Sequence, residues 1–300
     1  MKRLSRIAPL ILATLALAPS TPASARRAAL DDGTYARREP IALEIPRPAS
    51  ARDAWSEAVA GIRLLRRRMR HPSGAPLDVH AAYVDLCDAR VSLRATAPEE
   101  RGRRVSSWAR HVGAAVAING DFFVRGARPL GPARGDGRDW PDANAHYYDA
   151  IFAMAPGRAP RILERPPRTP AWTDLVASQE RIVVEGRPRL SPYVNHSRSR
   201  HPRSAIGLTR DGRTLILVAV DGRSRRSAGA TTPELGPIVR DLGAWNALRM
   251  DGGGSTALWV SGHGIVNTPS DGHERAVANH IGVIVSEPSP AGSRHAWCRE

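Results

Sequence analysis

An acidic turn with three consecutive glycines is the stretch of this sequence best suited to chemistry. Glycine loses more backbone entropy than other residues on ordering, so three in a row indicate positive φ angles or a ligand close to the main chain. We interpret the turn as a cradle of backbone amides flanked by useful side chains, and a plain hairpin turn is the alternative. Its members are Asp251, Gly252, Gly253, Gly254, Ser255 and Thr256.

A second polar group follows the apolar run 114–118. Asn119 and Asp121 lie just after it and precede Phe122 and Phe123, two of the three phenylalanines in the chain. If the run is a buried strand, these polar side chains are aimed at a pocket over an aromatic floor. A turn capped by a core aromatic pair is the alternative.

Short apolar runs flank these residues and are typical of strands. Residues 247–250 and 257–260 are each too short for a helix, so the glycine turn is expected between two strand ends. Residues 79–86 and 90–94 are expected to pair with each other. Further strands are expected at 114–118, 151–154, 182–186, 201–208, 214–220 and 281–285.

Three stretches predict helices. Thr231 and Glu234 form a capping-box pattern that begins one helix, and Gly243 ends it. Residues 104–111 fit a short helix, and the apolar spacing over 55–69 predicts another on a basic background. Strands and helices together indicate an α+β fold: a mixed β-sheet core with motif loops at strand ends and flanking helices, in a single domain.

The first 25 residues have the pattern of a secretory signal peptide. Basic residues precede a short apolar stretch at 7–18, and Ala-Ser-Ala at 23–25 fits a cleavage site. We therefore expect a secreted or periplasmic protein that is soluble after cleavage, because no later apolar run is long enough to span a bilayer. The expected divisions are a signal peptide (1–25), an N-terminal leader and helix (26–75), a main domain (76–288) and a C-terminal tail (289–300).

Charge and cysteine content narrow the possible partners. The formal net charge is +15, almost all from arginine, which favours an anionic partner. No helix-turn-helix, RNA-binding aromatic motif or zinc finger is present, so we expect no specific nucleic-acid partner. Cys87 and Cys298 are the two cysteines, and in an exported chain they could form one long-range disulfide.

Six motifs, in this order along the chain, resemble the phosphodiester glycosidase family. The resemblance covers residues 79–285, and six ordered motifs are far more specific than any single one. The motifs are Asn119-Gly-Asp-Phe-Phe, Pro202-Arg203-Ser-Ala-Ile-Gly, Val220-Asp221-Gly222-Arg223, Thr232-Pro-Glu-Leu, Asp251-Gly-Gly-Gly-Ser-Thr, and Asn267 through Arg275 to Asn279.

The resemblance implies hydrolysis of the bond between C1 of a sugar and a phosphate oxygen, which gives a free N-acetylglucosamine-like sugar and a phosphomonoester. Phosphate leaves as a stabilised anion, so a bidentate arginine matters more than a general acid. The catalytic candidates are Asp251, Arg203, Asp221 and Asp121, with Asp251 as oxocarbenium stabiliser, nucleophile or base. The substrate-binding candidates are Asn119, Arg223, Gly252, Gly253, Gly254, Ser255, Thr256, Asn267 and Arg275.

Some of these residues have structural alternatives. Asp221 could accept hydrogen bonds from turn amides, Arg275 could form a surface ion pair, and Asn267 could cap a turn. Only distances between the carboxylates would distinguish retention from inversion at the sugar.

Two other functions stay open. The glycosidase chemistry requires no cofactor, but Asp121, Asp221, Asp251 and Asn119 could instead gather around calcium or magnesium in a metal-dependent phosphodiesterase. The protein could also be a non-catalytic binder of an anionic cell-surface polymer, held by its arginines. The expected partner is a sugar-phosphodiester, or a phosphorylated glycan or cell-wall polymer.

Overall fold

The computed structural model describes one compact unit within Tyr35–Glu300. The signal peptide, most of the leader and part of the tail, as predicted from the sequence, lie outside the described residues. Described are residues 51–59, 61–71, 73–144, 146–167, 171–189, 199–286 and 293–298.

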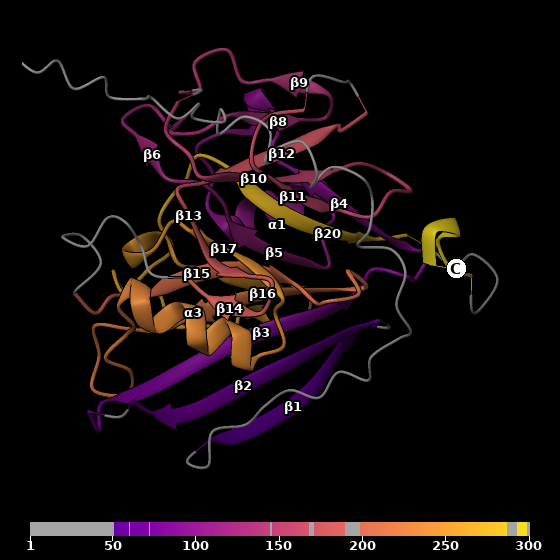
Figure 1. Ribbon diagram of the computed structural model, residues 1–300. Coiled ribbons are helices and arrows are strands. Elements are labelled where there is room, and N and C mark those ends of the chain that lie inside the picture. The colour runs from indigo at the N-terminus through magenta and orange to yellow at the C-terminus, as the bar shows by residue number, and fades with distance from the viewer. Residues whose placement is uncertain are drawn as a thin grey trace, which may run out of the picture. The chain divides into compact units, whose positions relative to one another are not determined.

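The largest sheet has eight strands, and its central strands are covered on both faces (Figure 1). This explains why residues 214–220 are apolar along almost their whole length. In sheet order the strands are β1 (Arg52–Val59), β2 (Ile62–Arg70), β3 (Pro76–Asp85), β16 (Thr214–Val220), β15 (Arg203–Leu208), β17 (Asn246–Met250), β13 (Glu180–Val184) and β14 (Arg187–Pro188).

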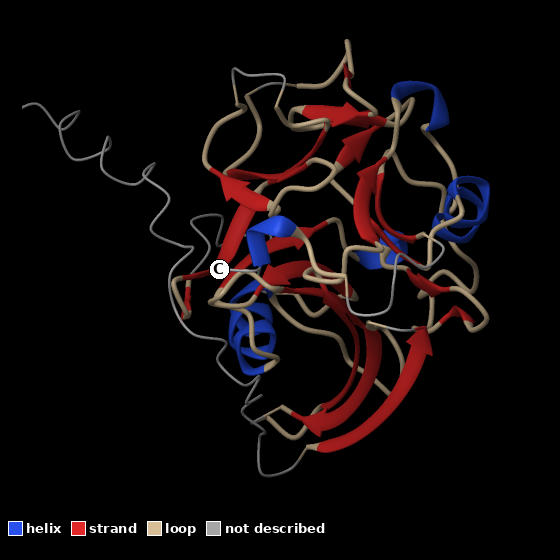
Figure 2. Ribbon diagram, turned by 90° about the vertical axis from the view of Figure 1, so that its right-hand side faces the viewer, coloured by secondary structure: helices blue, strands red, loops and turns tan. Residues whose placement is uncertain are grey.

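Two five-stranded sheets and a two-stranded ribbon complete the strands of the described residues (Figure 2). One sheet has the order β19 (Gly264–Ile265), β18 (Leu258–Val260), β5 (Val116–Asn119), β20 (His280–Val285) and β4 (Val91–Ala95). The other has the order β11 (Arg161–Leu163), β10 (Ala150–Met154), β12 (Asp174–Ser178), β8 (Ala133–Gly135) and β9 (Arg138–Asp139). The ribbon is β6 (Phe123–Val124) with β7 (Arg128–Pro129).

The three larger sheets share one hydrophobic core. Ile118, Phe152 and Leu217 come one from each sheet, and all are fully buried in the same cluster. Burying a side chain of this size contributes roughly 1.5–3 kcal/mol. The loops that leave these strands are therefore attached to a rigid base.

Two α-helices cover the sheets in the described part of the chain. α3 (Thr232–Asp241) begins at the predicted capping box, since Glu234 N donates to Thr231 Oγ1 at 3.3 Å and Thr231 N to Glu234 Oε2 at 2.9 Å. It packs on β13, β14 and β15. α1 (Val105–Val112) confirms the other short helix and packs on β5, β18 and β20. Single 3₁₀ turns are η3 (Pro98–Glu100), η4 (Gly253–Ser255) and η5 (Ala296–Cys298).

The helix predicted over residues 55–69 is wrong, because this stretch forms the hairpin of β1 and β2. Trp55 lies opposite Leu65 across the hairpin, and Gly61 turns the chain with a φ of 81°. The spacing of the apolar residues suited a helix, but β2 is paired along its whole length with β3. Arg67, 2% exposed, also bonds Asp53 through Nε at 2.8 Å. Tertiary pairing has overridden the local pattern.

The predicted α+β fold with a mixed sheet needs correction too. Every pairing between the named strands is antiparallel, and the described fold is mostly β-structure. Most of the predicted strands are present, but β1, β2 and β12 (Asp174–Ser178) were not predicted as strands. β3 and β4 do not pair as expected, because they belong to different sheets. A single domain is consistent with the one compact unit.

One disulfide links the tail to the body of the unit. Cys87 follows β3 and bonds Cys298 in η5, with a Cα–Cα distance of 5.6 Å across a sequence separation of 211 residues. This confirms the long-range bridge that the two cysteines suggested. No helix in the described residues is both long and apolar enough to cross a membrane.

Candidate active site

The glycine turn does not close a hairpin, because β17 before it and β18 after it belong to different sheets. The chain crosses from the eight-stranded sheet to a five-stranded one between Asp251 and Ala257. Two backbone bonds fix the crossing: Asp251 N donates to Gly120 O at 3.0 Å, and Gly253 N donates to Pro202 O at 2.8 Å. The turn is therefore held by the chain that follows β5 and the chain that precedes β15.

Asn119 joins these strand ends through its side chain. Its Nδ2 donates to Asp251 O at 2.7 Å, and its Oδ1 accepts from Ser204 Oγ at 2.7 Å and from Ala257 N at 3.2 Å. The side chain is fully buried. Asn119 lies in the site as predicted, but these bonds give it a positioning role, and contact with substrate stays a prediction.

The three glycines are explained by charged side chains that lie on the turn. A Cβ on Gly254 would come within 2.0 Å of Asp271 Oδ2 and 2.2 Å of Arg275 Nη2. A Cβ on Gly253 would lie 3.1 Å from Arg223 Nη2, and Gly253 also has a φ of 60°. A Cβ on Gly252 would lie 2.8 Å from Pro202 O. Close approach of charged side chains and of the Pro202 carbonyl to the main chain is the physical reason why these three positions are glycine.

Asp251 is the carboxylate at the centre of the turn, and it keeps partial access to solvent. Burial by its neighbours raises its pKa, against a hydrogen bond from Gly252 N to Oδ1 at 2.9 Å and the charges of Arg275 and Arg249. Ser255 also lowers this pKa, although its buried Oγ meets no strict hydrogen-bond geometry. Solvent access and nearby cations suit a carboxylate that meets substrate.

Asp121 lies near Asp251 but is closed off from solvent. It is 1% exposed, and its oxygens accept from Phe122 N at 2.7 Å and Gly131 N at 2.8 Å. Burial raises its pKa well above the ordinary value, and the charge of Asp251 raises it further. The structure thus brings two predicted carboxylates together, with different surroundings.

Arg203 is a buried cation beside the same turn. It is 5% exposed, and its guanidinium donates to two backbone carbonyls, Ala230 O at 2.8 Å and Ser199 O at 3.0 Å. No carboxylate of the described residues lies within ion-pair distance of it. Burial lowers the pKa of Arg203 to about 10, which still leaves it charged at neutral pH. A buried guanidinium without a carboxylate partner is suited to a bound anion.

Arg249 is a site residue that the sequence reasoning missed. It lies on β17 two residues before Asp251, and its Nε donates to Glu180 Oε2 at 2.8 Å. Its guanidinium carbon lies 4.5 Å from the centre of the Phe122 ring, so the predicted aromatic floor carries a cation. Its sequence position could have indicated a role in the site, because a charged residue is unusual in an apolar strand and this one lies just before the glycine motif.

His201 was also missed, although it directly precedes the Pro202-Arg203 motif. Its Nδ1 lies 3.2 Å from Arg223 Nη2. A guanidinium has only donors, so Nδ1 must accept and the ring proton is on Nε2. Burial and the charges of Arg203 and Arg223 lower the pKa of His201, which keeps the ring neutral.

Arg223 and Arg275 form the more exposed part of the site. Arg275 Nη2 bonds Asp271 Oδ2 at 2.6 Å, which is the ion pair considered as its structural alternative. Arg223, with a φ of 57°, lies 3.8 Å from Asp271 Oδ1 and 3.4 Å from Ser270 Oγ. Both guanidinium groups are within reach of an anion on the turn, and their binding role stays a prediction.

The remaining predicted residues divide into two kinds. Ser255 and Thr256 are each 1% exposed, and among the described residues their hydroxyl oxygens meet no strict hydrogen-bond geometry, so their binding role stays a prediction. Asn267 instead accepts from Leu258 N at 2.7 Å and donates to Thr256 O at 3.2 Å. Its side chain thus stabilises the backbone after the turn, which is the structural role considered as the alternative to substrate binding.

Asp221 is directed away from the other predicted carboxylates. It is 3% exposed, accepts from Thr268 N at 2.7 Å, and has its second oxygen 3.4 Å from His80 Nε2. Within the described residues, the group that could hold a metal combines Asp221 with Asp78 and His80. The expected cluster of Asp121, Asp221, Asp251 and Asn119 around one cation is therefore not assembled.

Comparison with known proteins identifies the family of the chain. The family model described as phosphodiester glycosidase matches residues 112–284, which include every predicted site residue. The chain belongs to the phosphodiester glycosidase family. Membership implies a hydrolase that acts on a glycosidic bond.

Solved structures share the fold at low sequence identity. The zebrafish N-acetylglucosamine-1-phosphodiester alpha-N-acetylglucosaminidase catalytic domain, auto-inhibited by its pro-peptide, is 19% identical with a TM-score of 0.62, over 80% of this chain and 89% of that one. A hypothetical protein from Synechocystis is 20% identical with a TM-score of 0.60, over 78% and 64%.

One curated relative matches in sequence over a short region. It is the SPbeta prophage-derived uncharacterized protein YomE of Bacillus subtilis (strain 168), which is 39% identical over 102 residues. The match covers 33% of this chain and 16% of that protein. This phosphodiester glycosidase family member thus spans only a small part of its curated relative.

Proposed function

We propose that this phosphodiester glycosidase family member hydrolyses the sugar C1–O bond of a sugar-1-phosphodiester and releases a free sugar and a phosphomonoester. An N-acetylglucosamine-like sugar is the first candidate, because the zebrafish enzyme of similar fold is named for that substrate. The acceptor is a phosphorylated glycan or cell-wall polymer. This setting agrees with the signal-peptide pattern at the start of the chain, which suggests a secreted or periplasmic enzyme.

The observation that carries the proposal is the group of arginines around one accessible carboxylate. Arg203 is buried, and within the described residues its partners are backbone carbonyls; Arg249 and Arg275 act electrostatically on Asp251. A substrate with a phosphodiester brings an anion for Arg203, whereas Arg249 and Arg275 already pair with Glu180 and Asp271. An uncharged glycoside would leave the buried Arg203 uncompensated.

The chemistry assigned to each group follows from its surroundings. Asp251 faces C1 as a carboxylate, where it stabilises the oxocarbenium character, forms a glycosyl ester or takes a proton from water. The guanidinium groups bind the phosphate and gain strength as the C1–O electrons pass to the leaving oxygen. His201 can donate one further hydrogen bond through Nε2 while its ring stays neutral.

A panel of sugar-1-phosphodiesters with different sugars tests this proposal. We expect free sugar and a phosphomonoester as products, with the fastest turnover for the preferred sugar. The matched control is Asp251→Asn, which keeps the side-chain shape and removes the charge. It is expected to fold normally and to lose turnover.

The other outcomes identify the alternatives. Release of sugar-1-phosphate would mean that a phosphorus–oxygen bond is broken and that the protein is a phosphodiesterase. Saturable, salt-sensitive binding of an anionic polymer without any turnover, unchanged in Asp251→Asn, would mean a non-catalytic binder.

A further inference from the structure

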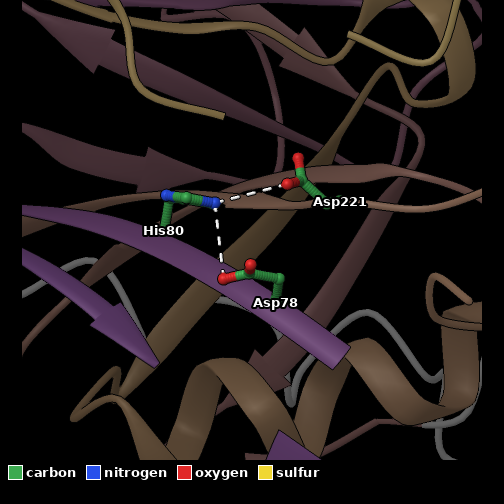
Figure 3. Close-up of side chains that lie close together, drawn as sticks. All are labelled: Asp78, His80 and Asp221. Carbon is green, nitrogen blue, oxygen red and sulfur yellow. Dashed lines mark ion pairs between the residues drawn. The ribbon is translucent and has the colours of Figure 1, made fainter. Parts of the chain in front are cut away.

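Three buried side chains meet beneath the turn that carries Arg223. Asp78 and His80 lie two residues apart on β3, so they face the same side of the sheet, and Asp221 follows the neighbouring strand β16 directly. Asp221 N bonds Asp78 O at 2.9 Å, which fixes the two strands at this point. Figure 3 shows the Nε2 atom of His80 directed between the two carboxylates.

The Nε2 atom of His80 is buried and has no hydrogen-bond partner among the residues that the structure describes. His80 is 6% exposed, with Asp78 and Asp221 each at 3%, and its Nε2 lacks any bond of acceptable geometry. It lies 3.6 Å from Asp78 Oδ1 and 3.4 Å from Asp221 Oδ2. A protonated imidazole that bonded these carboxylates directly would come to about 2.7–2.9 Å. Both distances are too long for that arrangement.

The two distances from His80 Nε2 suit neighbouring ligands of one metal ion. Zinc takes nitrogen and oxygen ligands at about 2.0–2.2 Å in tetrahedral geometry, which separates neighbouring ligand atoms by about 3.4 Å. One ligand atom from each of the three residues can be chosen so that all lie within 4.8 Å of one another. We propose that Asp78, His80 and Asp221 bind a divalent transition-metal ion, best matched by zinc, with water at the open position.

The donor set selects the class of metal. Calcium and magnesium prefer oxygen ligands in larger numbers, whereas an imidazole favours zinc and its transition-metal neighbours. The two carboxylates supply anionic donors for a divalent cation, although Arg66 and Arg68 also pair with Asp78. This site differs in residues and in metal class from the calcium or magnesium cluster that the sequence suggested.

The ligands are held in place by a second set of contacts. Arg66 donates to Asp78 through Nε at 2.9 Å and Nη2 at 2.6 Å, and Thr268 N donates to Asp221 at 2.7 Å. A carboxylate has lone pairs left for a metal after two such bonds. Such contacts orient metal ligands in known sites.

The metal would stabilise the loops at the edge of the active site and would not contact substrate. Asp221 opens the turn that ends in Arg223, and its bond to Thr268 N ties down the loop that leads to Asp271 and Arg275. A metal at Asp221 would thus fix two loops at once, including the positive φ of Arg223. This predicts a structural ion, with effects on stability as well as on activity.

Zinc binding by the purified full-length protein tests the proposal. After treatment with EDTA and dialysis, titration calorimetry with zinc chloride should give about one site per chain, and zinc should raise the melting temperature by mass action. His80→Gln should bind zinc at least about tenfold more weakly while its circular dichroism is unchanged. The matched control is His263→Gln, an exposed hairpin histidine, which should bind as the wild type does.

Several results would overturn the site. Absence of saturable zinc binding by the wild type is one, and undiminished binding by a folded His80→Gln is another. If His80→Gln does not fold, X-ray absorption on zinc-loaded wild-type protein decides the question. One imidazole with oxygen ligands supports the site, and any other ligand set contradicts it.

Discussion

Asp251, Asp121 and Asp221 differ in what their carboxylates can reach. Asp121 is 1% exposed with both oxygens on backbone amides, and Asp221 is 3% exposed and faces His80. Asp251 alone of the three keeps partial solvent access. We therefore propose Asp251 as the carboxylate that meets C1, with Asp121 and Asp221 holding the loops around it.

Arg203→Lys tests whether the buried guanidinium binds the phosphate. Lysine keeps the charge but cannot make two parallel bonds to an anion or keep both carbonyl contacts. We expect kcat/KM to fall on the order of a hundredfold with little change in melting temperature. Arg187→Lys, at an exposed position on β14, should leave both unchanged. Normal kcat/KM in Arg203→Lys would remove this residue from the mechanism.

His280 makes stability depend on pH. Burial lowers the pKa of His280 to about 3, from an ordinary 6.5, and Thr96 Oγ1 and Arg103 O hold the neutral ring. Below pH 6.5 the unfolded chain takes up a proton that the folded one refuses. Stability is therefore complete above pH 6.5 and lost as the pH falls toward 3, by up to about 1.4 kcal/mol per pH unit.

His280→Gln should remove this part of the acid sensitivity. Urea unfolding at several values between pH 7.5 and 4.5 should show a shallower loss of free energy in the variant than in the wild type. The exposed His263→Gln serves as control and should follow the wild type. Parallel curves for His280→Gln and the wild type would contradict the assignment.

At the scale of elements, the crossing between β17 and β18 is the feature that makes the site. Gly254→Ala would place a methyl group on the Asp271–Arg275 ion pair, 2.0 Å from Asp271 Oδ2. The pair must move off the turn, so we expect kcat/KM to fall on the order of tenfold to hundredfold, measured on the preferred sugar-1-phosphodiester.

The control for this change is Gly157→Ala. Gly157 also lies in a turn, with a φ of 68°, but a Cβ there meets nothing within 4 Å. The variant should lose some stability from backbone strain and keep its kcat/KM. Equal activity in Gly254→Ala and Gly157→Ala would show that the packing on the turn does not matter for catalysis.

The sequence predicted individual elements better than their partners. The capping box at Thr231 and Glu234 placed α3 correctly because capping is local chemistry. Residues 55–69 failed because their arginines pair with Asp53 and Asp78 of other strands, which spacing cannot reveal. For the same reason, the glycine turn could be placed between two strands but not between two sheets.

The candidate site shows the same division. The ordered motifs predicted that Asn119, Arg203 and Asp251 share one site. They do lie close together, because each is at the end of a strand and these strands share one core. Arg249 and His201 were missed because one lies inside an apolar strand and the other just before a motif. Asp221 was grouped with the wrong carboxylates, because its neighbour His80 is more than a hundred residues away in the chain.

At the scale of the whole molecule, charge and covalent structure agree with an exported enzyme for an anionic substrate. The net charge of +15 would attract a phosphorylated polymer, and the arginines around Asp251 would bind its phosphate at one place. The disulfide between Cys87 and Cys298 suits an oxidising compartment. Export and the polymer substrate remain proposals that activity on cell-envelope material would test.

In the reaction that we propose, water attacks the sugar and the phosphate leaves intact. Hydrolysis of a sugar-1-phosphodiester in water enriched in ¹⁸O, followed by mass spectrometry of the phosphomonoester, measures this directly. The C1–O cleavage that we propose predicts a phosphomonoester without ¹⁸O, formed by the wild type and not by Asp251→Asn. Incorporation of ¹⁸O into the phosphate would show phosphorus–oxygen cleavage and contradict the account.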